Sequence, residues 1–280
     1  MLTGARQNRN TVLTLMLGMA VLLLGGFVLF AEPEGESEPV VPSIGELELP
    51  EPVELPESVR VPILVYHHVR PQPPGLSASD QQYTVTPEAL AAHLQYLQDN
   101  DYTGVLLTDI RAALLEGAPL PDKPVAITFD DGRDNQFTAA YPLLEQYGFV
   151  ATFSPFTNAI GRPGYVTWEQ LSELSAAGHT IGSHAIYHPY MTKLADDELQ
   201  QEAAGSRAVL EERLNQEVTV FAHPFGLYDD RTNAALEAAG YTVARGLRHT
   251  SDHTRGDLMS LGSYIATESL SYLRSIVGEQ

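Results

Sequence analysis

The chain has 280 residues, of which 36 are acidic and 16 are basic, and its formal net charge is −20 at pH 7. An excess of negative charge this large argues against a protein that binds nucleic acid or anionic membranes through a basic patch. The chain has no cysteine, which excludes disulfides, Cys-ligated zinc and thiol nucleophiles, and its 44% of hydrophobic residues suffice for one folded domain with additional segments.

Residues 11–31 form an uncharged apolar stretch of 21 residues, long enough as a helix to cross a bilayer. Arg6 and Arg9 precede it and glutamates follow it, so the positive-inside rule places the rest of the chain outside the cell. A cleaved signal peptide is the alternative, but the stretch exceeds the usual apolar length of about 7–15 residues and ends in a poor cleavage site. We expect residues 1–31 to be a membrane anchor or signal segment, with a single transmembrane helix favoured and the protein secreted if the segment is cleaved.

Residues 32–58 contain nine Glu, six Pro and no Lys or Arg. Such a stretch cannot bury enough apolar surface to fold, and its prolines and like charges keep it extended. We therefore expect an acidic disordered linker, or stalk, ahead of a folded domain at 59–280. Setting aside the nine glutamates and the two preceding arginines leaves a charge of −13 for that domain.

In residues 59–280, short apolar runs alternate with helical patterns. We expect strands at 61–66, 125–129, 180–181 and 218–221, and an amphipathic helix at 195–216. Thr86 and Thr167 are predicted N-caps of two further helices, the second with Gln170 as its capping-box partner. This alternation predicts a parallel sheet with helices outside it, as in an α/β barrel or a doubly wound fold, where functional residues follow the carboxyl ends of the strands.

Asp130 and Asp131 directly follow the apolar strand at 125–129. Adjacent carboxylates repel each other, and they are rarely placed at a strand end without a cation between them. One of them can bind a metal while the other acts as a base. A solvated loop with a helix cap is the alternative interpretation.

His184 and His188 follow the strand at 180–181, four residues apart. On one face of a helical turn, such a pair can bind one divalent ion, and with an Asp it leaves coordination positions open. Taken alone, this spacing is more often a coincidence than a site. The segment at 221–226 ends another strand with a Pro and Gly turn around Phe225, which could aim a backbone N–H at a developing oxyanion or could be a plain turn. His67 and His68 end the first strand, where a histidine is a candidate general acid, although a lone histidine there is more often a structural hydrogen-bonding residue.

Taken together, the motifs TFDDG, SHAIYHP and FAHPFG resemble those of the polysaccharide deacetylases with a NodB homology domain, carbohydrate esterase family 4. The resemblance covers about residues 60–280. Within this family, the chain is most similar to the extracellular poly-N-acetylglucosamine deacetylases of biofilm systems, which also begin with a P-I-L-x-Y-H-like strand. The resemblance implies a distorted (β/α)7 barrel of the NodB type and a divalent metal, usually zinc.

The resemblance also implies a role for each matching residue. Asp131, His184 and His188 would bind the metal, and Asp130 would be the general base that activates the attacking water. The metal and the backbone N–H of Phe225 would stabilise the oxyanion, and a protonated histidine would supply a proton to the leaving amine.

The chain departs from the family pattern at two positions. Ala222 stands where the third motif usually has an arginine that orients the base, and the usual late Leu-x-x-His is not visible after residue 258. The biofilm-type enzymes take the acid from the first Y-H motif instead, which indicates His67. His68 remains an alternative, although side-chain alternation along a strand points only one of the two inward.

The expected function is therefore metal-dependent N-deacetylation of N-acetylglucosamine residues in an extracellular polysaccharide of the poly-β-1,6-N-acetylglucosamine type, with release of acetate and no nucleic-acid partner. Peptidoglycan or chitin-oligomer deacetylation is an alternative with the same catalytic positions. A carbohydrate-binding pseudoenzyme is a third hypothesis. The missing arginine favours it, and the retained pair of aspartates and pair of histidines argue against it.

Overall fold

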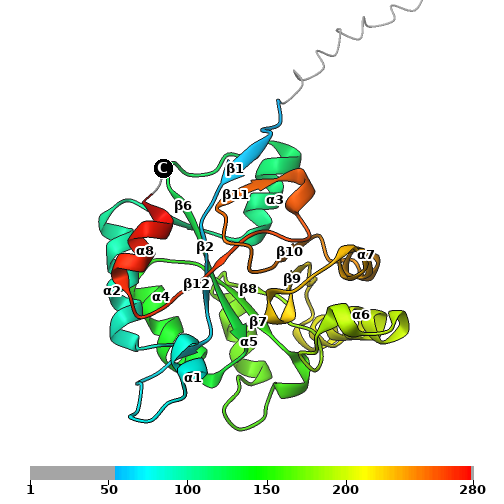
Figure 1. Ribbon diagram of the computed structural model, residues 1–280, viewed down its shortest axis with the longest axis horizontal. Coiled ribbons are helices and arrows are strands. Elements are labelled where there is room, and N and C mark those ends of the chain that lie inside the picture. Colours follow the sequence, from blue (N-terminus) through cyan, green and yellow to red (C-terminus); the bar gives the residue numbers. More distant parts are fainter. Residues whose placement is uncertain (1–53, 279–280) are drawn as a thin grey trace, which may run out of the picture. The chain divides into compact units, whose positions relative to one another are not determined.

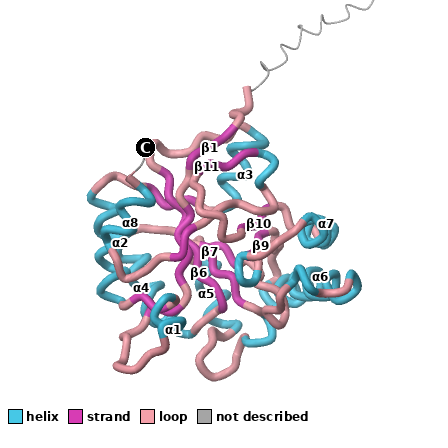
Figure 2. Tube along the Cα trace, viewed as in Figure 1, coloured by secondary structure: helices cyan, strands magenta, loops and turns pink. Residues whose placement is uncertain are grey.

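A parallel sheet lies at the centre of the computed structural model, which describes residues 54–278. In this sheet β12, β2, β6, β7 and β8 are neighbours in that order, β5 also pairs with β6, and β9 and β10 form a separate parallel pair. Parallel bridges join Ser183 to Phe221 and Arg245 to Leu261, and so connect the pair to β8 on one side and to the segment before β12 on the other. The result confirms the expected distorted (β/α)7 barrel, with helices around a central sheet (Figures 1 and 2).

The strands are β1 (Ser58–Arg60), β2 (Ile63–Tyr66), β3 (His68–Val69), β4 (Thr84–Val85), β5 (Thr103–Val105), β6 (Pro124–Asp131), β7 (Thr152–Pro155), β8 (Thr180–Ile181), β9 (Val220–Ala222), β10 (Val243–Arg245), β11 (Asp252–Thr254) and β12 (Tyr264–Ile265). The α-helices are α1 (Ala78–Gln82), α2 (Pro87–Asp99), α3 (Leu107–Glu116), α4 (Tyr141–Tyr147), α5 (Trp168–Ala176), α6 (Asp196–Leu214), α7 (Asp230–Ala239) and α8 (Leu270–Val277). Short helical turns are η1 (Gln136–Ala140), which is a π-helix, and the 3-10 turns η2 (Thr157–Ala159), η3 (Met191–Lys193), η4 (Pro224–Gly226) and η5 (Arg255–Asp257).

The helix ends follow the capping residues that the sequence predicts. The Thr86 hydroxyl accepts the N–H of Ala89 at 3.2 Å, and α2 begins at the next residue, Pro87. Thr167 and Gln170 form the reciprocal capping box at the start of α5. Each such cap is typically worth about 1 kcal/mol, because it satisfies a backbone donor that the helix leaves free.

Side-chain alternation along the central strands builds two apolar cores. Tyr66 and Phe129 belong to the larger core beneath the surrounding helices, whereas Ile63 and Ala126 belong to a smaller one that also includes residues of α3. In Figure 1, α2, α4 and α8 lie on one side of the sheet and α6 and α7 on the other. Because Ile63 and Ala126 face the barrel interior, the same alternation points the side chains at 67 and 130 inward at the carboxyl ends of β2 and β6.

The prediction for residues 1–31 and most of the linker predicted at 32–58 lie outside the residues that the structure describes. Ser58, the last residue of the predicted linker, is the first residue of β1. None of the helices between residues 54 and 278 combines the length and the apolar character that a membrane-spanning helix requires.

Candidate active site

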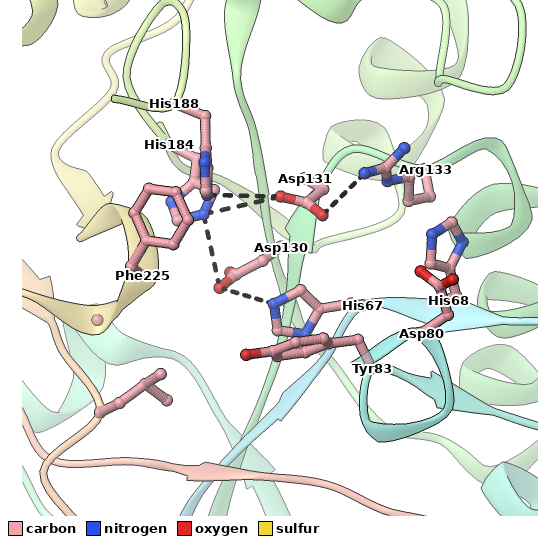
Figure 3. A pocket seen from close by; sticks show the side chains of 12 residues that line it. His67, His68, Asp80, Tyr83, Asp130, Asp131, Arg133, His184, His188 and Phe225 are labelled. Atoms are coloured by element: carbon pink, nitrogen blue, oxygen red, sulfur yellow. Dashed lines mark hydrogen bonds and ion pairs between the residues drawn. The ribbon is translucent and has the colours of Figure 1, made fainter. Parts of the chain in front are cut away.

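All six residues predicted to form the site line one cavity of about 390 Å³ at the carboxyl ends of the strands. Figure 3 shows His67 and the two aspartates facing the histidine pair across this cavity. The lining residues are His67, His68, Asp80, Tyr83, Asp130, Asp131, Arg133, His184, His188, Phe225, Gly226 and Leu247.

Asp130 and Asp131 enter the cavity through a sharp turn at the end of β6. Alternation sends Asp130 inward, and Asp131 then adopts a left-handed backbone with φ 72°, so that its side chain reaches the same cavity. Gly132 continues the turn at φ 69°, where a Cβ would lie 2.5 Å from the Cβ of Pro155. Only glycine fits at position 132, and this turn lets two adjacent carboxylates share one pocket.

Asp130 is a buried carboxylate with a buried cation beside it. Its Oδ1 accepts a hydrogen bond from the Arg245 guanidinium, and its Oδ2 lies 3.9 Å from Nε2 of both His67 and His184. Burial alone would raise the pKa of Asp130, but Arg245 and the two histidines outweigh burial and lower this pKa to about 2. Asp130 is therefore ionised at neutral pH and can accept a proton.

Arg245 corrects the expectation that no arginine orients Asp130. Ala222 does stand in the usual position, but in the pairing of β10 with β9 Arg245 lies directly beside it. The arginine thus reaches the base from the neighbouring strand, and it is only 1% exposed. The sequence signal was an arginine at the end of the apolar run at 243–244, which gains significance only when the strand order is known.

His184 and His188 lie on a loop after β8, and the predicted helical turn is wrong. Ala185 and His188 have left-handed backbones, with φ 68° and 57°, so the loop folds back on itself and brings both rings to the same point. The carboxylate of Glu202, on α6, accepts the N–H groups of Ile186 at 2.7 Å and Tyr187 at 3.1 Å and holds this loop. Sequence reasoning missed Glu202, which looks like any other polar residue of a long helix.

Asp131, His184 and His188 form the candidate metal centre. Oδ1 of Asp131 lies 3.9 Å from Nε2 of His184 and 3.8 Å from Nε2 of His188, and one ligand atom from each residue lies within 4.8 Å of the others. Nδ1 of His184 donates to the Ala222 carbonyl at 2.6 Å, which leaves the Nε2 lone pair free. Two imidazoles and a carboxylate at these separations fit a divalent ion with bond lengths of about 2.0–2.2 Å.

The protonation state of His188 and the hydrogen bond that Arg133 donates to Asp131 also suit the binding of a cation at this centre. Burial and the neighbouring His184 lower the pKa of His188 to about 4, so its ring is neutral at pH 7. Oδ2 of Asp131 accepts from Arg133 at 3.2 Å, which leaves Oδ1 for a metal. Arg133 in turn donates to the Tyr165 hydroxyl at 2.8 Å.

The structure separates the two candidate acids, His67 and His68. In Figure 3, His67 points at Asp130 and its ring packs on Tyr83, with centroids 4.7 Å apart, whereas His68 points away from Asp130. Nδ1 of His68 instead contacts Nδ2 of Asn135. Burial lowers the pKa of His67, although the two aspartates oppose this effect. Only His67 is therefore within reach of the base, as strand alternation predicts.

Phe225 lies in the 3-10 turn η4 beside the histidine pair. Its backbone is left-handed at φ 60°, and its N–H has no hydrogen-bond partner among residues 54–278. Its ring lies edge-on against His188, at a centroid distance of 4.5 Å, and stacks on Tyr190 at 3.9 Å. A free N–H on a tight turn at the cavity wall is the arrangement expected of an oxyanion donor. Trp168, an aromatic residue at the start of α5 that could line a sugar subsite, packs against the apolar core and is not among the residues that line the cavity.

Comparison with known proteins agrees with this geometry. Residues 117–244 match the polysaccharide deacetylase family. YxkH of Bacillus subtilis (strain 168), which is assigned to the polysaccharide deacetylases, is 31% identical over 184 residues. This match covers 66% of the length of this chain and 63% of the length of YxkH. The poly-β-1,6-N-acetyl-D-glucosamine N-deacetylase of Escherichia coli (strain K12) is 30% identical over 38% of this chain and 19% of its own.

A peptidoglycan-N-acetylglucosamine deacetylase of Bacillus cereus is 32% identical over 44% of this chain and 56% of its own. The match thus spans less than two thirds of the length of each of these three relatives. Among solved structures, the Streptococcus pyogenes deacetylase PplD in complex with acetate superposes with a TM-score of 0.70 at 25% identity, over 78% of this chain and 98% of its own. The motifs, the barrel and these matches agree that the chain contains a polysaccharide deacetylase domain of the NodB type, carbohydrate esterase family 4.

Proposed function

We propose that this protein hydrolyses the N-acetyl group of N-acetylglucosamine residues in an extracellular polysaccharide of the poly-β-1,6-N-acetylglucosamine type and releases acetate. The observation that carries the proposal is the convergence, in one cavity, of a buried ionised carboxylate, a three-ligand metal set and His67. Similarity to a protein named as a deacetylase of that polymer supports the choice of substrate.

In the proposed reaction, Asp130 accepts a proton from water while the water oxygen bonds to the carbonyl carbon of the acetamide. The N–H of Phe225 donates a hydrogen bond to the oxygen on which negative charge develops. The C–N bond then breaks, and His67 donates a proton to the departing nitrogen, so that the products are acetate and a free amine. The 3.9 Å between Asp130 and His67 places the proton acceptor and the proton donor on the same side of the cavity.

Asp131, His184 and His188 would hold the divalent metal, for which we propose zinc. When bound, such an ion supplies positive charge that acidifies water and polarises the carbonyl. Arg133 and the Ala222 carbonyl orient two of these ligands, whatever the ion.

We further propose that residues 59–280 are the deacetylase domain, that 32–58 are a linker, and that 1–31 anchor the protein in the cell membrane or direct its secretion. The polymer substrate would then meet the domain outside the cell. The uncharged stretch at 11–31 and its arginine flank support this arrangement.

Peptidoglycan is the second candidate substrate, because a peptidoglycan-N-acetylglucosamine deacetylase is also similar to this chain. The pseudoenzyme hypothesis loses its main support, since Arg245 supplies the arginine that the third motif lacks.

Mass spectrometry tests the proposal. The full chain with zinc is incubated with β-1,6-linked N-acetylglucosamine oligomers and, separately, with peptidoglycan fragments, and the Asp130→Asn variant serves as control. We expect the β-1,6 oligomers to lose the mass of an acetyl group replaced by hydrogen, and the control to leave them unchanged. Loss from peptidoglycan alone would reassign the substrate, and loss from neither would refute the enzyme hypothesis.

A further inference from the structure

The polypeptide changes partners at His67, the residue proposed as the acid. β2 (Ile63–Tyr66) pairs with β6, whereas β3 (His68–Val69) pairs with β4, so His67 lies between two ladders. Its carbonyl therefore depends on another donor, because a buried carbonyl without a partner costs free energy. That donor is the side-chain amide of Gln136, at 2.9 Å.

Gln136 ties the acid to the base. Its Nε2 also donates to the carbonyl of Asp130, so one amide group bridges the backbones of the two residues whose side chains meet in the cavity. Gln136 is fully buried. A shift of this amide would change the distance between His67 and Asp130 directly.

Asn135 holds the next two residues of the same segment. Its Oδ1 accepts the N–H of Val69 at 2.8 Å, and its Nδ2 lies 3.1 Å from Nδ1 of His68. Asn135 precedes the π-helix η1, which begins at Gln136. Such wide turns are uncommon and occur frequently at functional sites.

We propose that Asn135 and Gln136 are positioning residues that hold His67 at the distance and orientation from which it protonates the leaving group. This inference rests on the proposed function, in which water adds to the carbonyl carbon, the bond to the leaving atom breaks, and that atom takes a proton from His67. The two amides contact the 67–69 segment, and neither residue is among those that line the cavity of the site.

The test compares leaving groups that differ in their need for a proton. Phenyl acetate and the acetamide of an N-acetylglucosamine oligomer have poor leaving groups, whereas nitrophenoxide leaves p-nitrophenyl acetate without protonation. For Asn135→Ala and Gln136→Met we expect turnover of the oligomer to fall by about 10²-fold, and the p-nitrophenyl to phenyl acetate rate ratio to rise about 10-fold or more. KM and zinc content should stay near their wild-type values.

Two matched variants remove similar hydrogen bonds far from His67. Asn100→Ala removes an amide that donates to the Tyr96 carbonyl at 2.8 Å, and Tyr102→Phe removes a hydroxyl that donates to the Val277 carbonyl at 2.7 Å. Both should lower stability without changing the rate ratio. An unchanged ratio in Asn135→Ala and Gln136→Met, or an equal rise in the controls, would overturn the inference.

Two further readouts separate this inference from the proposed function. If the wild-type protein releases no acetate from any sugar oligomer, the proposed function fails. The p-nitrophenyl to phenyl acetate rate ratio still tests the role of the two amides in that case. The NMR resonance of the His67 ring tests the role of the amides without any turnover. This resonance should shift in Asn135→Ala, while the resonances of His184 and His188 stay in place. If Gln136→Met does not fold, Asn135→Ala decides, and an unmoved His67 resonance there refutes the inference.

Discussion

Replacing Arg245 by methionine should strip Asp130 of its main counter-charge without opening a large cavity. The lowering of the Asp130 pKa from its ordinary 3.8 to about 2 corresponds to roughly 2 kcal/mol of net stabilisation of the folded state. Removing one partner of a buried pair typically costs about 3–5 kcal/mol, which is larger because burial of the remaining charge then loses its main opposing interaction. We expect a loss of 2–5 kcal/mol at pH 7, as bounded by these two figures.

The same substitution should raise the pKa of Asp130, because burial is the largest influence on it and acts upward. A carboxylate with a depressed pKa stabilises the fold above its ordinary pKa and loses that contribution as the pH falls to the folded value, here between 3.8 and about 2. In Arg245→Met, the acid limb of kcat/KM should move to higher pH, and the loss of stability between pH 3.8 and about 2 should shrink or disappear, with zinc content retained. Arg245→Lys should restore part of both.

Arg231→Met is the control, because its guanidinium forms an ion pair with Asp196 on the surface, with side chains 48% and 90% exposed. Exposed pairs contribute at most about 1 kcal/mol, so this variant should unfold close to the wild-type urea midpoint and keep its pH profile. The measurements are urea unfolding and acetate release as functions of pH. If Arg245→Met loses stability while its acid limb stays in place, Arg245 supports the fold without tuning the base, and the reasoning is wrong.

Four other predictions follow from the same geometry. Asp130→Asn should abolish acetate release but keep the metal, as measured by enzymatic acetate assay and atomic absorption, and equal loss of zinc would contradict the division of roles between the two aspartates. His184→Ala should lower both zinc content and melting temperature, because metal binding is coupled to folding. The measurement is the melting temperature with and without added zinc, which should no longer rise in this variant. His67→Ala should slow acetamide hydrolysis by about 10²-fold or more, whereas His68→Ala should act weakly, and the reverse order would move the acid to His68. The metal-free protein should lose stability as the pH falls from 6.5 to about 4. Burial lowers the pKa of His223 to about 4 in the folded state, so in this pH range the imidazole takes up a proton on unfolding. Urea midpoints that do not change across this pH range would contradict the prediction.

Much of the site is readable from the sequence because parallel strands bring their carboxyl ends together. Asp130, His184 and Phe225 are each weak signals in isolation, but each follows an apolar run that becomes a barrel strand, so the fold itself makes them neighbours. The two-residue period of a strand, a local property, predicts that only one of His67 and His68 points inward, whereas the choice of His67 came from the family resemblance.

Arg245 and Glu202 could not be predicted in the same way. Arg245 acts on Asp130 because β10 lies beside β9, and that neighbourhood depends on the closure of the barrel, which no local pattern encodes. Glu202 acts from α6 on a loop 15 and 16 residues earlier in the chain, through backbone groups that carry no side-chain signature. Residues that orient other residues are therefore harder to find than residues that carry the chemistry.

The predicted helical turn at 184–188 was wrong for a reason that bears on the whole site. Of the six non-glycine residues with left-handed backbones between residues 54 and 278, four are Asp131, Ala185, His188 and Phe225. Each such backbone costs about 1–3 kcal/mol unless its surroundings impose it. A regular helix or strand would space the ligands by its own period, and only these irregular turns bring an aspartate, two histidines and a free N–H around one point. The fold must therefore hold the turns with contacts such as that of Glu202 to the 186–187 backbone. Substitutions that relieve the backbone strain of these turns should stabilise the apo-protein while weakening its affinity for the metal.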